Sequence, residues 1–373
     1  MAIARRNLFQ DRMRFALSVL GVALAVMLIL VLTGLLDGTF KQVTRYLENS
    51  SGSIVVAQSG VKNLLGATSI LPPGTPDTVR STEGVERAVP IFSQFLILDL
   101  HGKKQPVYMV GYDSSLGGGG PWRMAQGREP QAENEAVLDS VLAQKHEIAV
   151  GDEVAVMGRH FTIVGLSSDT TSWMTSFLFV RKVDAEELFR TPGATSFLLV
   201  TPTSGTGEEE LGDRLNDADG PERVTGAHAL LKSDMIANDR SLFARFFSTP
   251  LQLMVAVAFL VGVMVVGLVI YTATVERQRE YGVLKAIGAR NGLLYRVVLT
   301  QALIAAVAGA FVGAGLSAGA AWAIMAVRPQ FLVSTELSSV GWALPAALGM
   351  ALLAALIPAR VMARLAPADV FRR

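Results

Sequence analysis

The sequence predicts a membrane protein in which four transmembrane helices carry one large α+β domain, inserted between the first and second spans. Hydrophobic residues make up 51% of the chain and the mean hydropathy is +0.41, a combination that soluble domains rarely reach. The apolar residues also gather into four runs. About 20 such residues suffice to cross a hydrocarbon core of about 30 Å, so each run is a candidate span.

The four runs place the predicted spans at residues 15–36, 251–273, 297–327 and 340–357. The first two match the thickness of a bilayer, whereas the third is longer and can tilt or kink. The fourth is short and carries Pro345 in its first turn, where proline is tolerated. A secretory signal peptide has an apolar core of about 7–15 residues, so we expect the longer first run to remain as an uncleaved span.

Basic residues near the span ends predict the orientation. Residues 1–14, 275–296 and 357–373 each carry a net charge of +3, together +9, whereas the whole chain carries +1. The remainder therefore carries −8, and basic flanks stay in the cytoplasm. We expect a multi-pass protein of the inner or plasma membrane of a bacterium, with both termini cytoplasmic. Residues 1–14 read equally well as an interfacial segment along the inner leaflet and as an ordinary positive flank.

The inserted region, residues 38–246, mixes strand and helix patterns and is expected outside the cell membrane. Strands are predicted near residues 53–57, 86–100, 106–112 and 134–138, a β-rich module covers about 121–201, and helices are predicted at 208–216 and 226–247. The glycines at 117–120 predict a flexible loop between subdomains. The chain has no cysteine, so the domain must be stabilised by its own core, which about 200 residues can supply.

Residue types that would carry catalysis or bind a cofactor are missing or misplaced. No G-x-x-x-x-G-K-[ST] sequence is present, which predicts that the chain binds no nucleotide through a P-loop. The four histidines lack metal-ligand spacing, and Gly315–Gly319 matches G-x-S-x-G only inside an apolar span. We therefore expect no enzyme activity, no catalytic, cofactor or metal residues and no nucleic-acid partner. Energy must come from another protein.

Small residues recur every four positions in the third predicted span, at Gly309, Gly313, Ser317 and Ala321. This spacing places them on one face of a helix. Small faces let helix backbones approach closely in lipid, so the row predicts a packing seam against a neighbouring span.

The segment at 275–292 is charged and helix-prone, yet it is enclosed by two spans. It therefore belongs at the cytoplasmic membrane surface, where another protein can push on it. VERQREYGVLKAIGARNGLLYRVVLTQALIAAVAGAFVGA resembles the coupling segment and third span of the MacB/FtsX/LolC-type ABC transporter permeases, also called type VII. Three further stretches resemble the N-terminal segment, the β-rich module and the C-terminal tail of this family: ARRNLFQDRMRFALSVLGVALAV, ENEAVLDSVLAQKHEIAVGDEVAVMGRHFTIVGL and IPARVMARLAPADVFRR.

The resemblance covers most of the chain and implies a permease or mechanotransmission subunit. It implies a homodimer with two ABC ATPases, which bind the ATP, and an outer domain that moves as they close. The sequence shows no counterpart of the ATPase domain fused to MacB-like members, so a separate cytoplasmic ATPase is implied. Matching the coupling helix position by position identifies Glu276, Arg277, Arg279, Glu280, Tyr281, Leu284 and Lys285. Tyr281 departs from the branched aliphatic common in the family, and Gln301 from an acidic residue.

Tyr281 and Leu284 are expected to dock into a groove of the ATPase, while the charges fix the register. The resemblance implies export or extraction of a cargo, and the apolar spans favour an amphiphilic one, such as a lipid, a lipopeptide, an antibiotic or a haem-like molecule. Two alternatives remain open: a regulator that activates an extracytoplasmic cell-wall hydrolase and transports nothing, and a sensor without an ATPase. An extracytoplasmic adaptor or hydrolase as a further partner also stays open.

Overall fold

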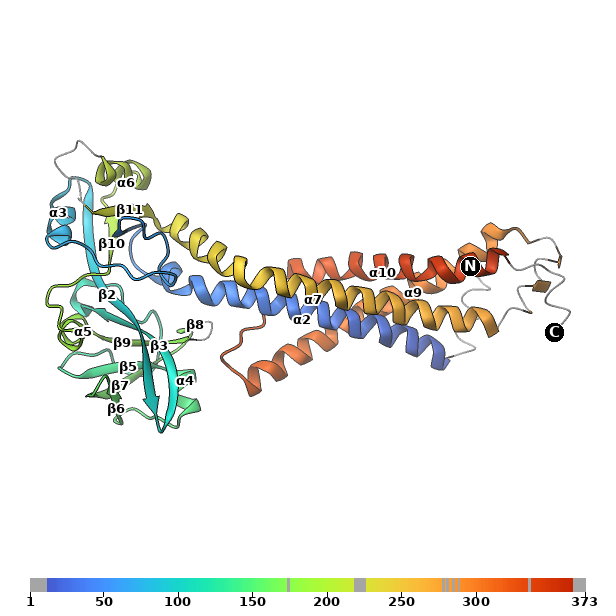
Figure 1. Cartoon of the computed structure of the whole chain (residues 1–373), viewed down its shortest axis with the longest axis horizontal. Coiled ribbons are helices and arrows are strands. Elements are labelled where there is room, and N and C mark those ends of the chain that lie inside the picture. The colour runs from blue at the N-terminus through green and yellow to red at the C-terminus, as the bar shows by residue number, and fades with distance from the viewer. Residues whose placement is uncertain are drawn as a thin grey trace. The chain divides into compact units, whose positions relative to one another are not determined.

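The chain divides into two compact units, which are described separately. The computed structural model describes residues 12–172, 175–217, 226–276, 279, 282–283, 286–287, 289–334 and 337–364. One unit, here called the helical unit, comprises Met1–Gly38 and Phe247–Arg373; the other, the α+β domain, comprises Thr39–Phe246. Figure 1 shows the elements of both units in chain order.

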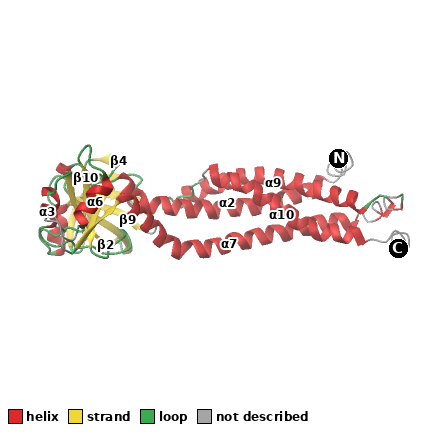
Figure 2. Cartoon of the chain, turned by 90° about the horizontal axis from the view of Figure 1, so that it is seen from above, coloured by secondary structure: helices red, strands yellow, loops and turns green. Residues whose placement is uncertain are grey.

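Four long helices form the helical unit: α2 (Arg12–Asn49), α7 (Lys232–Glu276), α9 (Asn291–Val327) and α10 (Leu337–Arg364). The last residues of α2 and the first residues of α7 belong to the α+β domain. The four helices lie lengthwise beside one another (Figure 2). Their shared core is made of small and branched apolar side chains, among them Val22, Val26, Ala306 and Ala347.

Three of these helices are long and apolar enough to cross a membrane. Within the described residues, they are Phe15–Asn49, Lys232–Glu276 and Asn291–Val327. The fourth predicted span coincides with the shorter apolar helix Val340–Leu356. Three of the four predicted spans therefore meet the length criterion, and the fourth falls short of it.

The α+β domain contains one sheet of 11 strands within its described residues, in the order β11-β1-β10-β2-β3-β9-β5-β7-β4, with β6 on β7 and β8 on β9. The strands are β1 (Ile54–Gln58), β2 (Val85–Leu100), β3 (Lys103–Tyr112), β4 (Met124–Gly127), β5 (Glu135–Asp139), β6 (Glu153–Val156), β7 (Arg159–Ser167), β8 (Thr171–Ser172), β9 (Thr175–Arg181), β10 (Phe197–Pro202) and β11 (Ala227–Leu231). β2 joins the two halves of the sheet, because its first residues pair with β10 and its remaining residues pair with β3.

Short helices cover the sheet: α3 (Thr75–Ser81), η1 (Ser114–Leu116), α4 (Ser140–Lys145), α5 (Lys182–Phe189) and α6 (Glu208–Asn216). Their ends follow from local chemistry. The buried carboxylate of Asp139 caps α4 by accepting the backbone N–H of Leu142 at 3.1 Å. α6 begins with three glutamates, whose charge is favourable at a helix N-terminus.

Most of the predicted elements of this domain are confirmed, among them the four predicted strands, which form β1, β2, β3 and β5, and the helix at 208–216, which is α6. The prediction for residues 227–231 is wrong: they form strand β11 rather than the start of a helix. This segment, AHALL, has no strong strand preference of its own. Pairing with β1 along five residues decides its conformation, since tertiary context overrides local propensity.

Candidate functional site

Most of the predicted coupling residues lie outside the described residues. These are Arg277, Glu280, Tyr281, Leu284 and Lys285. Glu276 is the last residue of α7, and Arg279 is described as helical. Between them and α9, Val283 and Ile287 are joined by a helical hydrogen bond of 3.1 Å and are 47% and 76% exposed. Two exposed apolar side chains one turn apart are a surface that a protein partner can cover.

The small-residue row of α9 packs against α2. A methyl group at Gly309 would lie 2.5 Å from Cβ of Val22, and one at Gly313 would lie 2.6 Å from the carbonyl oxygen of Ala23. Ser317 and Ala321 are also buried, and the Ser317 hydroxyl is satisfied by the carbonyl of Ala314 at 2.8 Å. The two backbones therefore approach through glycine, as small faces allow in lipid.

A second glycine contact in the helical unit was not predicted. Gly34 and Gly38 of α2 meet the segment between α9 and α10, where the N–H of Ser334 donates to the carbonyl of Gly34 at 2.8 Å. A side chain at Gly38 would collide with the carbonyl of Leu332. The sequence signal was available, because Gly34 and Gly38 form a G-x-x-x-G motif at the end of the first apolar run.

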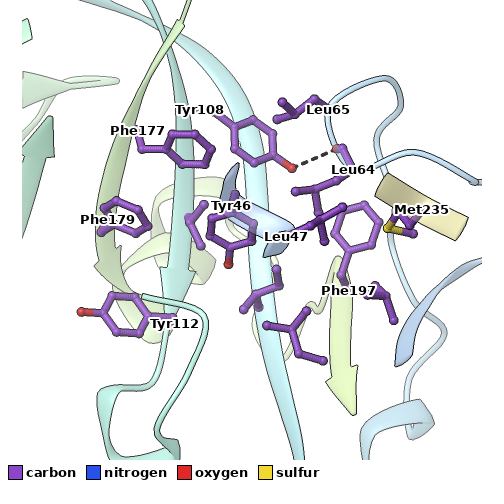
Figure 3. Close-up of a cluster of buried hydrophobic side chains, with 14 of the residues drawn as sticks. Tyr46, Leu47, Leu64, Leu65, Tyr108, Tyr112, Phe177, Phe179, Phe197 and Met235 are labelled. Carbon is purple, nitrogen blue, oxygen red and sulfur yellow. Dashed lines mark hydrogen bonds between the residues drawn. The ribbon is translucent and has the colours of Figure 1, made fainter. Parts of the chain in front are cut away.

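One buried cluster of the α+β domain contains residues from both helices that connect it to the helical unit. Figure 3 shows its centre, where Tyr46 of α2 lies toward Phe177 and Phe179 of β9 and Leu47 lies on the side of Leu64 and Phe197. Tyr46 and Leu47 are 1% and 0% exposed, and Met235 of α7 is 0% exposed. We call this set the anchor cluster: Val43, Tyr46, Leu47, Leu64, Leu65, Tyr108, Tyr112, Phe177, Phe179, Phe197 and Met235.

Aromatic packing fixes α2 in the anchor cluster. The Tyr46 ring stacks on Phe177 with centroids 5.4 Å apart and an interplanar angle of 9°. Phe177 in turn stacks on Phe179 at 5.6 Å. The Tyr46 hydroxyl donates to the carbonyl of Gly119 at 2.8 Å. Such ring pairs stabilise a core beyond the effect of burying apolar area. The Tyr46 side chain therefore combines a large buried ring with a hydroxyl group that has its hydrogen-bond partner.

Three of the four glycines at 117–120, for which the sequence predicts a flexible boundary loop, are closely packed, and Gly118 and Gly119 lie near the end of α2. A methyl group at Gly119 would lie 2.6 Å from Ile91, and one at Gly118 would lie 2.8 Å from Cβ of Ser51. Gly120 is equally crowded by the ring of Tyr112. Gly119 also has a φ of +76°, which glycine adopts without strain. Gly118, Gly119 and Gly120 thus allow close packing that a side chain would prevent.

Buried polar groups join the loop at 59–71 to the anchor cluster. Asp239 of α7 accepts the N–H groups of Leu64 at 3.1 Å and Leu65 at 3.4 Å, the partners that a buried carboxylate requires. Tyr108 places its hydroxyl 3.2 Å from the carbonyl of Leu64 and 2.8 Å from Oγ of Ser93. Burial raises the pKa of the Tyr108 phenol well above its usual value, so it stays protonated as a donor.

Two ion pairs that share Asp169 lie at the surface of the α+β domain, and one of them involves α2. Asp169 lies 3.1 Å from Arg45 of α2 and 2.6 Å from Arg123. These groups are partly exposed, so each pair adds little to stability. Among the described residues, no group of three or more His, Cys, Asp or Glu is placed to hold a metal.

Comparison with known families gives two matches that together cover most of the chain. The family described as MacB-like periplasmic core domain matches residues 15–218. The family described as FtsX-like permease C-terminal matches residues 253–367.

Individual relatives agree with these families. The macrolide export ATP-binding/permease protein MacB of Nitrosomonas europaea is 22% identical over 98% of this chain, which spans only 57% of that relative. An uncharacterized ABC transporter permease of Mycobacterium tuberculosis is 24% identical over 84% of both chains. Among solved structures, the periplasmic region of MacB from Actinobacillus actinomycetemcomitans aligns with 52% of this chain and with 94% of its own chain. The sequence identity is 13% and the TM-score is 0.38.

Proposed function

The chain belongs to the family of ABC transporter permeases that join a MacB-like periplasmic core domain to an FtsX-like C-terminal region, and from this premise we propose that it transmits force from a cytoplasmic ABC ATPase to its α+β domain. The ATPase is a separate subunit that binds and hydrolyses the ATP. Two copies of the permease form the working unit. Movement of the α+β domain outside the membrane serves export or extraction of an amphiphilic cargo.

The anchor cluster is the observation that carries this proposal. α2 and α7 each contribute residues to the helical unit and to the α+β domain, and both place side chains in this single core. Close-packed interiors have low compressibility and transmit strain. Within the α+β domain, a displacement of the end of α2 or the start of α7 would therefore reach the sheet through Tyr46 or Met235.

The segment at 275–292 is the proposed contact with the ATPase, and a double substitution there tests the proposed function. Tyr281→Ala with Leu284→Ala should abolish capture of the ATPase in pull-downs, because buried apolar anchors contribute roughly 2 kcal/mol or more each to an interface. A charge reversal at Arg279 should weaken capture less and in a salt-dependent way.

The matched control is Leu268→Ala with Tyr271→Ala, which removes the same two side-chain types at the same spacing from α7. Leu268 and Tyr271 are 64% and 39% exposed, so the control should insert, fold and retain the ATPase. Retention of the ATPase by the Tyr281/Leu284 variant as well would exclude this segment as the transmission point.

Topology can be tested directly because the chain has no cysteine. The distribution of basic residues supports cytoplasmic termini and an α+β domain outside. A cysteine at the exposed Ser204 should react with an impermeant maleimide in intact cells. One at the exposed Gly292 should react only after permeabilisation. The opposite labelling pattern would rule out both the orientation and a cytoplasmic coupling segment.

Activation of an extracytoplasmic cell-wall hydrolase is the competing function for the same architecture. Both functions require the ATPase, so ATPase capture does not separate them. Cargo-dependent stimulation of ATP hydrolysis does, because only a transporter couples hydrolysis to a bound cargo. Stimulation by a hydrolase in the absence of any amphiphile would favour the regulator.

A further inference from the structure

A cavity of about 500 Å³ lies within the helical unit, between α2, α7 and α10. Small-molecule sites typically measure about 300–1,000 Å³. Ile29, Leu30 and Thr33 of α2 form one wall, and Phe259 of α7 forms another. α10 contributes the third wall, from Trp342 to Gly349.

The cavity exists because α10 lines it with small residues, whereas α2 and α7 line it with larger side chains such as Leu30 and Phe259. Ala343, Ala346 and Gly349 follow at spacings of three and share one face of the helix. A Cβ atom at Gly349 would meet only Phe259, at 3.8 Å, which is an ordinary van der Waals distance. The missing side-chain volume at these positions is therefore left open rather than filled by neighbouring side chains.

The lining demands an apolar occupant. Among the described residues that line the cavity, Thr33 and Trp342 have the polar side chains, and the Thr33 hydroxyl already donates to the carbonyl of Ile29 at 2.9 Å. Water would find too few of the two to four partners that it needs. A polar ligand would lose its own hydrogen bonds on entry.

The depth of the cavity fits part of a single hydrocarbon chain. Trp342 and Gly349 are about 10 Å apart along the helix axis at 1.5 Å per residue. Two of the three surrounding helices, α2 and α7, are long and apolar enough to cross a membrane, and α10 contains the shorter apolar stretch Val340–Leu356, so bilayer chains have access to the cavity.

We propose that this cavity binds one acyl chain of a bilayer phospholipid. The ester end lies at Trp342, which is 75% exposed and of a residue type enriched at membrane interfaces. The methylene groups run past Ala346 to Gly349. The site holds a structural or regulatory lipid, whatever cargo the permease moves, and so does not depend on the function proposed above.

The test uses the full chain in nanodiscs of phosphatidylethanolamine and phosphatidylglycerol with a trace of phospholipid carrying a mid-chain diazirine. After irradiation, adducts should concentrate on Phe259 and residues 343–349. Gly349→Leu fills the cavity and should reduce these adducts about tenfold, because displacing about two methylene groups costs about that factor in affinity. Ala346→Leu should do the same from the neighbouring turn, which guards against a folding defect in one variant.

The control is Ala318→Leu on an exposed position of α9, which should leave the adducts unchanged. Phe311, 73% exposed, reports labelling by bulk lipid and should not respond to any variant. Equal adduct yields in the parent and in both cavity variants would overturn the proposal. So would a disulfide between copies carrying Ala346→Cys, since it would show that a second copy covers the cavity.

Discussion

Replacing Tyr46 by alanine should destabilise the α+β domain by about 3–5 kcal/mol, the usual cost of truncating a large buried aromatic side chain. The ring is 1% exposed, stacks on Phe177 and lies edge-on to Trp122 at 6.2 Å. Its loss would leave a cavity where α2 joins the sheet. Urea unfolding of the full-length protein, followed by the protease sensitivity of this domain, measures the effect.

Tyr46→Phe is the matched control for that experiment. It keeps the ring contacts and removes the hydroxyl that donates to Gly119, so it should cost only about 1 kcal/mol. Under the proposed function, Tyr46→Ala should also lose transport while still capturing the ATPase, since the substitution lies far along the chain from 275–292. Parent-like stability of Tyr46→Ala would show that α2 is not held by this cluster.

Gly313→Leu should disrupt the packing of α9 on α2. The first side-chain atom would already lie 2.6 Å from the carbonyl oxygen of Ala23, and a backbone atom cannot move aside as a side chain can. Overpacking typically costs about 1–3 kcal/mol and occasionally more, and we expect this variant at or above the upper end. Its apparent melting temperature in detergent should fall well below that of the parent.

The same helix supplies the control. Gly315 lies half a turn away, and a Cβ atom there would meet no neighbour within 4 Å. Gly315→Leu introduces the same side chain into the same span and should remain close to the parent in heat stability. If the Gly313→Leu variant had the same melting temperature as the parent, the small-residue row would face lipid or detergent and not α2.

Residue spacing predicted which face of a helix packs, but not which neighbour it packs against. The interval of four identified Gly309 and Gly313, and both are buried. The spacing of four does not identify α2 as the neighbouring helix, because the spacing of residues in one helix carries no information about which other helix packs against it. Gly34 and Gly38 carry the same spacing of four in α2, where they contact the segment between α9 and α10.

Glycine runs and short apolar segments were harder to interpret. The sequence at 117–120 has the composition of a flexible linker, yet its conformation is set by Ser51, Ile91 and Tyr112, which come from distant parts of the chain. Strand β11 was not predicted for a similar reason, since its pairing partner β1 precedes it by about 170 residues in the sequence. Local composition indicates which conformations a segment can adopt, whereas contacts with residues far away in the sequence decide which conformation it does adopt.

The long strand β2 has a consequence for how the α+β domain opens. Residues on one side of Ile91 pair with β10, and those on the other side pair with β3. Its side chains enter three separate cores, through Ala88, Val89 and Phe92. Neither half can shed this strand without exposing apolar surface of the other. Amide hydrogens in both halves should therefore exchange with solvent in one cooperative opening rather than in two.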